Sequence, residues 1–177
     1  MREEVIIAGS GGQGIMFAGT LLAHAAMEEG LNVTYFPSYG AEMRGGTANC
    51  TVIISVENIG SPVVTNPSAL LAMDGGSLER FASKVKKGGL IIVNSSLSKK
   101  EIRIDGVEVS KIPATQLAEK LGDSRVTNMV ILGAYINRRK VVSLERTMES
   151  LKKVLGEGRE DLLKLNKEAL RKGEECR

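Results

Sequence analysis

The chain has 177 residues, of which 42% are hydrophobic and 25% charged, a balance typical of a soluble globular protein with one domain. Its formal net charge of +3 is small and is spread along the chain, which argues against nucleic acid or a membrane surface as a partner. With no Trp, three Tyr and three Phe, it has too few aromatic side chains to stack single-stranded bases.

Two cysteines, Cys50 and Cys176, form no CxxC motif and are too few to hold an iron–sulfur cluster or a structural zinc ion. A single distant pair is weak support for a disulfide and suits a reducing cytosol. The N-terminus lacks the apolar segment of a signal peptide, and no apolar run approaches the roughly 20 residues of a membrane span. We therefore expect a cytoplasmic protein.

The beginning of the chain is typical of a βαβ unit. Residues 5–8 form an apolar run that ends at Gly9 and predicts a buried parallel strand. Residues 13–29 carry apolar side chains at helical spacing, and Gly30 is placed to end that helix. Residues 32–36 predict the second strand, which completes the unit.

The rest of the chain predicts further strands and then helices. Strands are expected at 48–56, 70–74 and 90–93, and helices at 78–87, 113–121, 128–137, 143–155 and 160–172. Residues 102–109 alternate around Asp105-Gly106, which indicates a hairpin. The sequence therefore predicts one Rossmann-like three-layer α/β domain over residues 1–177. We expect a mostly parallel sheet, a hairpin at one edge and a C-terminal helical extension at about 143–177.

Between the first strand and the first helix, the glycine loop Gly9-Ser10-Gly11-Gly12-Gln13-Gly14 fits the pattern G-x-G-x-x-G. Glycines permit a tight turn and a close approach of the backbone, and the start of the helix presents N–H groups to an anion. The loop is thus a candidate binding site for a phosphate-bearing ligand. The alternative is that its glycines only allow the helix to pack closely on the sheet.

A conventional NAD site also needs an acidic residue at the end of the second strand, where it holds the ribose. Here residues 35–39 are Tyr-Phe-Pro-Ser-Tyr, and the first carboxylate after them is that of Glu42. This departure argues against a stand-alone NAD(P)-binding oxidoreductase. That class stays open as an alternative, together with a non-catalytic nucleotide-binding module.

A second loop follows the second strand and offers a hydroxyl, a carboxylate, a guanidinium and paired glycines. Its candidate binding residues are Tyr39, Glu42, Arg44, Gly45, Gly46 and Thr47. Ligands of open α/β sheets bind at the carboxyl edge, where this loop is expected to lie. The Arg44 guanidinium is suited to clamp a phosphate or carboxylate beside the glycines. A solvated turn with a surface Glu42–Arg44 ion pair explains the segment equally well.

Together these segments resemble the gamma subunit, or gamma domain, of 2-oxoacid:ferredoxin oxidoreductases. The resemblance covers nearly the whole chain, and its combined motifs are far more specific than the glycine loop alone. They are Gly9-Ser10-Gly11-Gly12-Gln13-Gly14, Pro37-Ser38-Tyr39-Gly40, Glu42-Met43-Arg44-Gly45-Gly46-Thr47-Ala48-Asn49-Cys50, Ile59-Gly60-Ser61-Pro62, Thr127-Asn128-Met129-Val130-Ile131-Leu132-Gly133-Ala134, and the tail from Asn166 through Ala169 to Gly173. The loop at 42–47 is more similar to the 2-oxoglutarate and 2-oxoisovalerate enzymes than to the pyruvate enzymes.

The resemblance implies a reaction in which a 2-oxoacid and coenzyme A (CoA) give an acyl-CoA, carbon dioxide and two electrons for ferredoxin. Thiamine diphosphate supplies the carbanion chemistry, and [4Fe-4S] clusters carry the electrons. This sequence has no Gly-Asp-Gly thiamine motif, and Gly122-Asp123-Ser124, the nearest to it, predicts a helix end. The resemblance therefore implies that thiamine diphosphate, Mg²⁺ and clusters belong to partner chains, the alpha, beta and ferredoxin-like delta subunits. No catalytic residue is expected on this chain, whose two loops are expected on the CoA side of the site.

Four further side chains have ordinary explanations. His24 is interpreted as a packing or surface residue of the first helix, and Cys50 as a small buried hydrophobe. Asn128 is placed to cap the start of an apolar helix. For Asp74, at the end of a predicted strand, contact with a ligand and capping of the following turn both remain open.

Overall fold

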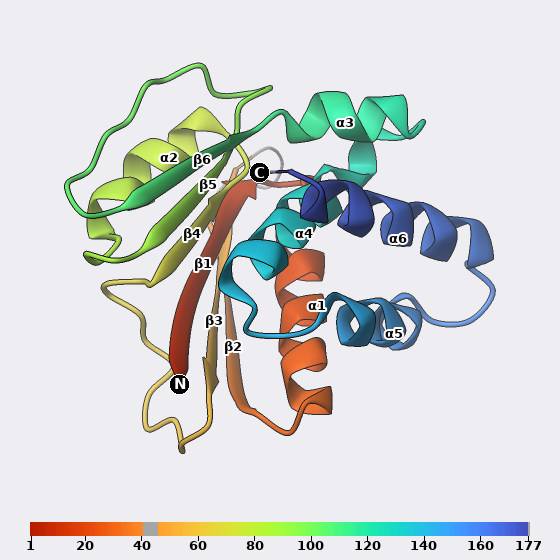
Figure 1. Cartoon of the computed structure of the whole chain (residues 1–177), viewed down its shortest axis with the longest axis horizontal. Helices are drawn as coiled ribbons and strands as arrows, with labels where there is room; N and C mark the ends of the chain where they lie inside the picture. Colours follow the sequence, from red (N-terminus) through yellow and green to blue (C-terminus); the bar gives the residue numbers. More distant parts are fainter. Residues whose placement is uncertain (41–45, 177) are drawn as a thin grey trace.

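The computed structural model describes residues 1–40 and 46–176 of the chain. At its centre is a six-stranded sheet of order β2-β3-β1-β4-β5-β6 (Figure 1). The strands are β1 (Arg2–Ser10), β2 (Asn32–Tyr39), β3 (Thr47–Ser55), β4 (Ala69–Ala72), β5 (Leu90–Asn94) and β6 (Glu108–Ile112). β3 runs antiparallel to both of its neighbours, and the other pairs are parallel. The carboxyl ends of the remaining strands therefore share one edge, which confirms the mostly parallel α/β sheet.

The middle strands are apolar throughout because both of their faces are covered. Every residue of β4 and β5 is buried, which is the expected pattern for parallel strands between two layers of helices. Along β1 the side chains alternate between two cores. Val5 and Ile7 join the larger apolar cluster, whereas Ile6 and Ala8 join the smaller one.

The helices cover the two faces unequally, as Figure 1 shows. The larger cluster receives side chains from α1 (Ile15–Glu28), α3 (Ala114–Lys120), α4 (Thr127–Arg139), α5 (Leu144–Leu155) and α6 (Glu160–Glu174). The smaller cluster lies under α2 (Gly75–Phe81), the short turn Ala82–Lys84 and the apolar residues of the segment 102–109. The three-layer arrangement with C-terminal helices is thus confirmed.

The edge hairpin is present, but not where the sequence places it. It is formed by β2 and β3, whose pairing runs from Asn32 opposite Ser55 to Tyr39 opposite Ala48. The hairpin predicted at 102–109 is wrong, because no strand covers residues 102–104. Ile102 and Ile104 instead pack against the smaller core, and β6 pairs in parallel with β5. Burial of these alternating side chains, not a backbone ladder, explains the sequence pattern.

The two helices α4 and α6 cross in backbone contact. A Cβ atom added at Gly133 would lie 2.0 Å from the carbonyl oxygen of Leu170, and one at Gly173 would lie 2.0 Å from that of Val130. Only glycine fits such a crossing, so these two residues set how closely the C-terminal helix docks. Within the described ranges, no helix is both long and apolar enough to cross a bilayer.

Candidate functional site

The glycine loop closes on itself at the carboxyl end of β1. The side-chain oxygen Oε1 of Gln13 accepts a hydrogen bond of 2.8 Å from the Ser10 amide, and the Gln13 amide donates to the Ser10 carbonyl over 3.2 Å. Gly14 then stands in the left-handed region, with φ of 71°, directly before α1 begins. A side chain three residues from the end of the strand therefore holds the turn.

The glycines of this loop have two different roles. A Cβ atom at Gly9 would lie 2.9 Å from the Met73 Cβ, and one at Gly14 would lie 2.3 Å from the Nδ2 of Asn128. These two positions are glycine because the loop packs closely. Gly11 and Gly12 are exposed, and a Cβ atom at Gly12 would meet nothing within 4 Å. Gly12 is therefore the position whose backbone N–H group has no hydrogen-bond partner among the described residues and is accessible to a ligand.

The second loop meets the glycine loop, as the sequence predicts. The Gly11 amide donates a hydrogen bond of 2.8 Å to the carbonyl oxygen of Gly46, and Ser10 pairs with Thr47 in the ladder between β1 and β3. Tyr39 ends β2 at the same edge and is 70% exposed. The other candidates of this loop, Glu42, Arg44 and Gly45, lie outside the described residues.

Two side chains from later in the chain hold the glycine loop. Asn128 lies inside α4, where its Nδ2 donates a hydrogen bond of 3.0 Å to the Gly14 carbonyl. The expectation that it caps this helix is wrong, because Val126 occupies the N-cap position and Asn128 faces the loop instead. The second is Asp74, whose carboxylate accepts a 2.8 Å hydrogen bond from the Ser10 hydroxyl.

Asp74 is also the N-cap of α2, so its capping role is confirmed. Its Oδ1 accepts hydrogen bonds from the Ser77 amide at 2.9 Å and the Ser77 hydroxyl at 2.8 Å. Capping in this way satisfies an amide that has no partner within the helix. Since Oδ2 receives the Ser10 hydroxyl, one carboxylate joins α2 to the glycine loop.

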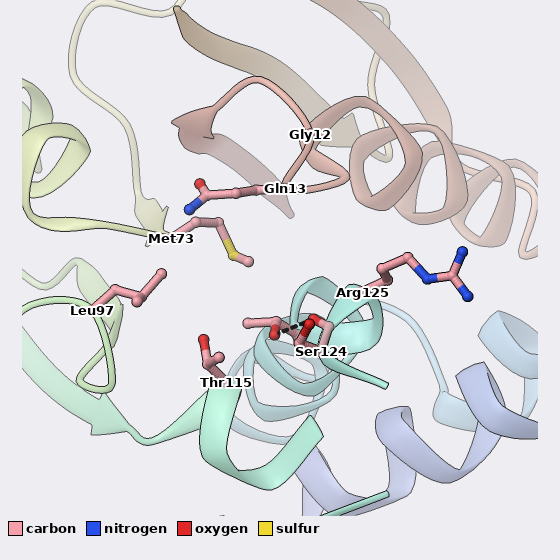
Figure 2. A pocket seen from close by; sticks show the side chains of 8 residues that line it. Gly12, Gln13, Met73, Leu97, Thr115, Ser124 and Arg125 are labelled. Atoms are coloured by element: carbon pink, nitrogen blue, oxygen red, sulfur yellow. Dashed lines mark hydrogen bonds between the residues drawn. The ribbon is translucent and has the colours of Figure 1, made fainter. Parts of the chain in front are cut away.

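A cavity of about 220 Å³ opens beside the glycine loop on the α4 side of the sheet edge. Figure 2 shows the Gln13 amide lying over Met73, with Thr115 and Ser124 across the cavity. The Arg125 guanidinium points away from it and pairs with Asp123 at 2.6 Å. The uncharged polar side chains of Gln13, Thr115 and Ser124 therefore share this cavity with the apolar side chains of Met73 and Leu97. Its lining residues are Gly12, Gln13, Met73, Leu97, Thr115, Ser124, Arg125 and Thr127.

The fully buried amide of Asn94 fixes one wall of this cavity. Its Nδ2 donates to the hydroxyl oxygen of Thr115 at 2.9 Å and to the Met73 carbonyl at 3.2 Å. Because Asn94 ends β5 and Met73 follows β4, the side chain ties two neighbouring strand ends to the start of α3. The sequence pattern alone gives no sign of this contact.

A second cavity, of about 300 Å³, lies on the opposite side of the same loop, between α2 and the start of β3. It is lined by Gly9, Ser10, Thr47, Ala48, Asn49, Asp74, Gly76, Ser77, Arg80 and Phe81. Arg80 is the site residue that sequence reasoning missed. It lies within a helix with no motif around it, and only the packing of α2 brings it to the loops.

Cys50 is no candidate nucleophile. Its side chain is fully buried, its Sγ lies 3.6 Å from the Ile15 carbonyl, and burial raises the pKa of the thiol to about 12. A cysteine of this kind is protonated at neutral pH and therefore unreactive. The interpretation as a small buried hydrophobe is confirmed. His24 is half-buried on α1, consistent with a packing residue.

Comparison with known proteins identifies relatives across the whole domain. The family described as "Pyruvate ferredoxin/flavodoxin oxidoreductase" matches residues 4–176. The "2-oxoglutarate synthase subunit KorC" of Methanothermobacter marburgensis is 39% identical over 91% of this chain and 90% of its own length. The "Ketoisovalerate oxidoreductase subunit VorA" of Methanothermobacter thermautotrophicus is 38% identical over 97% of this chain. The chain spans only 36% of that longer relative.

Two solved structures share the fold over nearly the whole chain. The gamma subunit of a keto/oxoacid ferredoxin oxidoreductase from Geobacter sulfurreducens is 31% identical, with a TM-score of 0.83 over 98% of this chain and 96% of its own. The 2-oxoglutarate:ferredoxin oxidoreductase of Magnetococcus marinus, with 2-oxoglutarate, coenzyme A and succinyl-CoA bound, is 30% identical, with a TM-score of 0.88. That match covers 97% of this chain and 30% of the longer one.

Proposed function

Since this chain belongs to the pyruvate ferredoxin/flavodoxin oxidoreductase family as a gamma-type domain, we propose that it is the gamma subunit of a thiamine-dependent 2-oxoacid:ferredoxin oxidoreductase. The proposed reaction joins a 2-oxoacid and CoA into an acyl-CoA, releases carbon dioxide and passes two electrons to ferredoxin. Support comes from relatives in which the same domain is either a separate subunit or about a third of a longer chain.

The described residues do not fit the redox cofactors of such a complex. Among residues 1–40 and 46–176, no group of three or more His, Cys, Asp or Glu side chains is placed to hold a metal ion. Asp123 belongs to Gly122-Asp123-Ser124, the segment of the sequence most similar to a thiamine motif. Its carboxylate is bound by the Arg125 guanidinium, which lowers the pKa of the Asp123 carboxyl group. As the family resemblance implies, we propose that the alpha, beta and ferredoxin-like delta subunits hold thiamine diphosphate, Mg²⁺ and the [4Fe-4S] clusters, and that the isolated chain is inactive.

The observation that carries a CoA-facing role is the hydrogen bond between Gly11 and Gly46. This hydrogen bond joins the two glycine-containing loops at the carboxyl edge of the sheet, where ligands of open α/β sheets bind. CoA carries several phosphates, and accessible backbone amides beside a guanidinium bind such groups well. In this proposal the glycine loop takes part of the phosphate-bearing end, and Arg44 adds a charge.

The test is a reconstituted complex that carries Arg44→Ala. The KM for CoA is expected to rise about tenfold, the scale of one lost charge-assisted contact. Exchange of labelled carbon dioxide into the 2-oxoacid, which needs no CoA, stays near the wild-type rate. Arg159→Ala is the matched control, because this exposed arginine lies far along the chain at the start of α6. Normal use of CoA by the Arg44 variant would overturn the CoA assignment.

For the substrate, we propose a 2-oxoglutarate or branched-chain 2-oxoacid in preference to pyruvate. The similarity to subunits named for 2-oxoglutarate and ketoisovalerate enzymes supports this choice. Assays of the intact complex with pyruvate, 2-oxoglutarate and 2-oxoisovalerate decide it, and a preference for pyruvate would contradict it. Titration of the purified chain with NADH covers the alternative of a nucleotide-dependent dehydrogenase, for which no binding is expected.

A further inference from the structure

The cavity between α2 and the start of β3 presents an arginine and a carboxylate to the same space. Gly9, Ser10 and Thr47 form one wall of it, and Gly76, Ser77 and Arg80 form the other. The cavity therefore shares residues with both loops of the proposed CoA site. Its volume of about 300 Å³ is at the small end of the range for ligand pockets and suits part of a large ligand.

Among residues 1–40 and 46–176, Arg80 uses one of its donors at this cavity. Its Nη1 donates a hydrogen bond of 3.2 Å to the hydroxyl oxygen of Thr47, and its guanidinium carbon lies 5.2 Å from the centre of the Phe81 ring. A guanidinium has five N–H donors. Within the described ranges, no carboxylate lies within ion-pair distance of Arg80. The described residues therefore leave the Arg80 guanidinium available to an oxyanion.

Asp74 limits which anion can bind there. Its two oxygens accept hydrogen bonds from the Ser77 amide, the Ser77 hydroxyl and the Ser10 hydroxyl. A carboxylate has about four acceptor positions, so about one remains for a further donor. A bare phosphate against this carboxylate would be repelled, because like charges at close range disfavour one another. A suitable ligand presents a hydroxyl to Asp74 and a phosphate to Arg80.

A ribose with a phosphate and a free hydroxyl on adjacent carbons meets both requirements. CoA carries such a group, the 3′-phosphate beside the 2′-hydroxyl of its adenosine. We propose that Arg80 and Asp74 bind this phosphorylated ribose, Arg80 through the 3′-phosphate and Asp74 through the 2′-hydroxyl. The proposal rests on the proposed function, because it takes CoA as the ligand. It makes Arg80 a residue that distinguishes CoA from dephospho-CoA.

The experiment compares KM values for CoA and dephospho-CoA in the reconstituted complex. For Arg80→Ala, the KM for CoA is expected to rise about tenfold, and the KM for dephospho-CoA is expected to stay unchanged. Lys84→Ala is a matched control, since its ammonium also lies 5.2 Å from the Phe81 ring but the residue does not line the cavity. It is expected to keep the wild-type ratio of the two KM values.

Arg80→Gln guards against a failure of the alanine variant to assemble, because glutamine removes the charge but keeps part of the aliphatic stem and a polar end with N–H donors. It is expected to show the same loss of discrimination. If both Arg80 variants keep the wild-type ratio of KM values, the ribose assignment is overturned. If the Arg80 variants keep that ratio but Arg44→Ala still raises the KM for CoA, only the ribose assignment falls, and the proposed function stands. If Arg44→Ala also leaves CoA use normal, the CoA-facing role falls as well.

Discussion

Asn128 on α4 donates a side-chain hydrogen bond of 3.0 Å to the carbonyl oxygen of Gly14, which lies 114 residues earlier in the chain. The same carbonyl accepts from the Ala18 amide over 3.0 Å, at the first turn of α1. The end of the glycine loop is therefore fixed both by its own helix and by a helix from the C-terminal half. This contact connects the helical layer to the proposed ligand edge.

Replacement of Asn128 by alanine is expected to lower the free energy of unfolding by about 1–2 kcal/mol, because a nearly buried hydrogen bond is lost. It is also expected to raise the KM for CoA, since the glycine loop loses its anchor. Urea unfolding of the purified chain and CoA kinetics of the assembled complex measure the two effects.

Asn137→Ala is the control for this variant. Asn137 lies on the same helix, and its Nδ2 donates to the Glu174 carbonyl over 2.9 Å, away from the glycine loop. Its loss affects the contact between α4 and α6 and is expected to leave the KM for CoA unchanged. An Asn128 variant with wild-type CoA kinetics would show that the anchor is only structural.

The strongest local patterns predicted the elements well. Gly30, expected as a helix end, has φ of 77° and follows Glu29, the C-cap of α1. Ser143, expected as an N-cap, accepts from the Arg146 amide at 3.2 Å. Both of these helix-end signals depend only on a few neighbouring residues, so the sequence alone is enough to predict them. The meeting of the two loops was also predictable from the sequence, because the direction of the strands alone brings the carboxyl ends of β1 and β2 to one edge of the sheet.

The features that the sequence predicted wrongly or missed share a different cause. The alternating pattern at 102–109 is compatible with a ladder or with burial against a neighbouring core, and only the packing of α2 decides between them. Arg80 reaches Thr47 across 33 residues and Asn128 reaches Gly14 across 114. Side chains that act through such distant contacts leave no periodic signal, so one sequence cannot identify them.

The crossing of α4 and α6 predicts that Gly133→Ala is severely destabilising. An alanine Cβ would overlap the Leu170 carbonyl, so the helices must separate and lose apolar contacts. The cost is expected to be about 2–4 kcal/mol, at the upper end of the range for overpacking. Thermal or urea unfolding of the purified chain measures it. Gly60→Ala is the control, because nothing lies within 4 Å of that position and the substitution should be nearly neutral.

The buried ion pair between Glu3 and Arg139 predicts strong coupling. The Arg139 guanidinium donates to both Glu3 oxygens at 2.8 Å, and the Glu3 side chain is 6% exposed. Glu3→Leu leaves a partly buried charge unpaired and is expected to cost about 3–5 kcal/mol. The double variant Glu3→Leu, Arg139→Leu is expected to cost less than the two single changes together.

A double-mutant cycle followed by urea unfolding measures this coupling. The exposed pair of Lys87 and Asp105, with side chains 81% and 92% exposed, serves as the comparison. Its coupling is expected to stay below about 1 kcal/mol, since solvent screens exposed charges. Equal coupling in the two pairs would contradict the view that burial makes the first one important.

The Cys50 thiol predicts a loss of stability at alkaline pH. Burial raises its pKa from 9.0 to about 12 in the folded state, so the folded chain keeps this proton at a pH where the unfolded chain releases it. The contribution of the thiol to the free energy of unfolding is therefore fully present below pH 9 and is lost as pH rises toward 12. At a pH about 1.5 units above the pKa of the unfolded chain, the lost stability is about 2 kcal/mol. Cys50→Ala removes this pH dependence, whereas other groups that titrate at alkaline pH, such as Tyr135, titrate in both proteins, so their effects cancel in the comparison.

Urea unfolding at pH values below 9 and near 10.5 measures the effect. The stability advantage of the wild type over Cys50→Ala is expected to shrink by about 2 kcal/mol. An advantage that stays constant over this range would mean that the thiol does not ionise on unfolding as proposed.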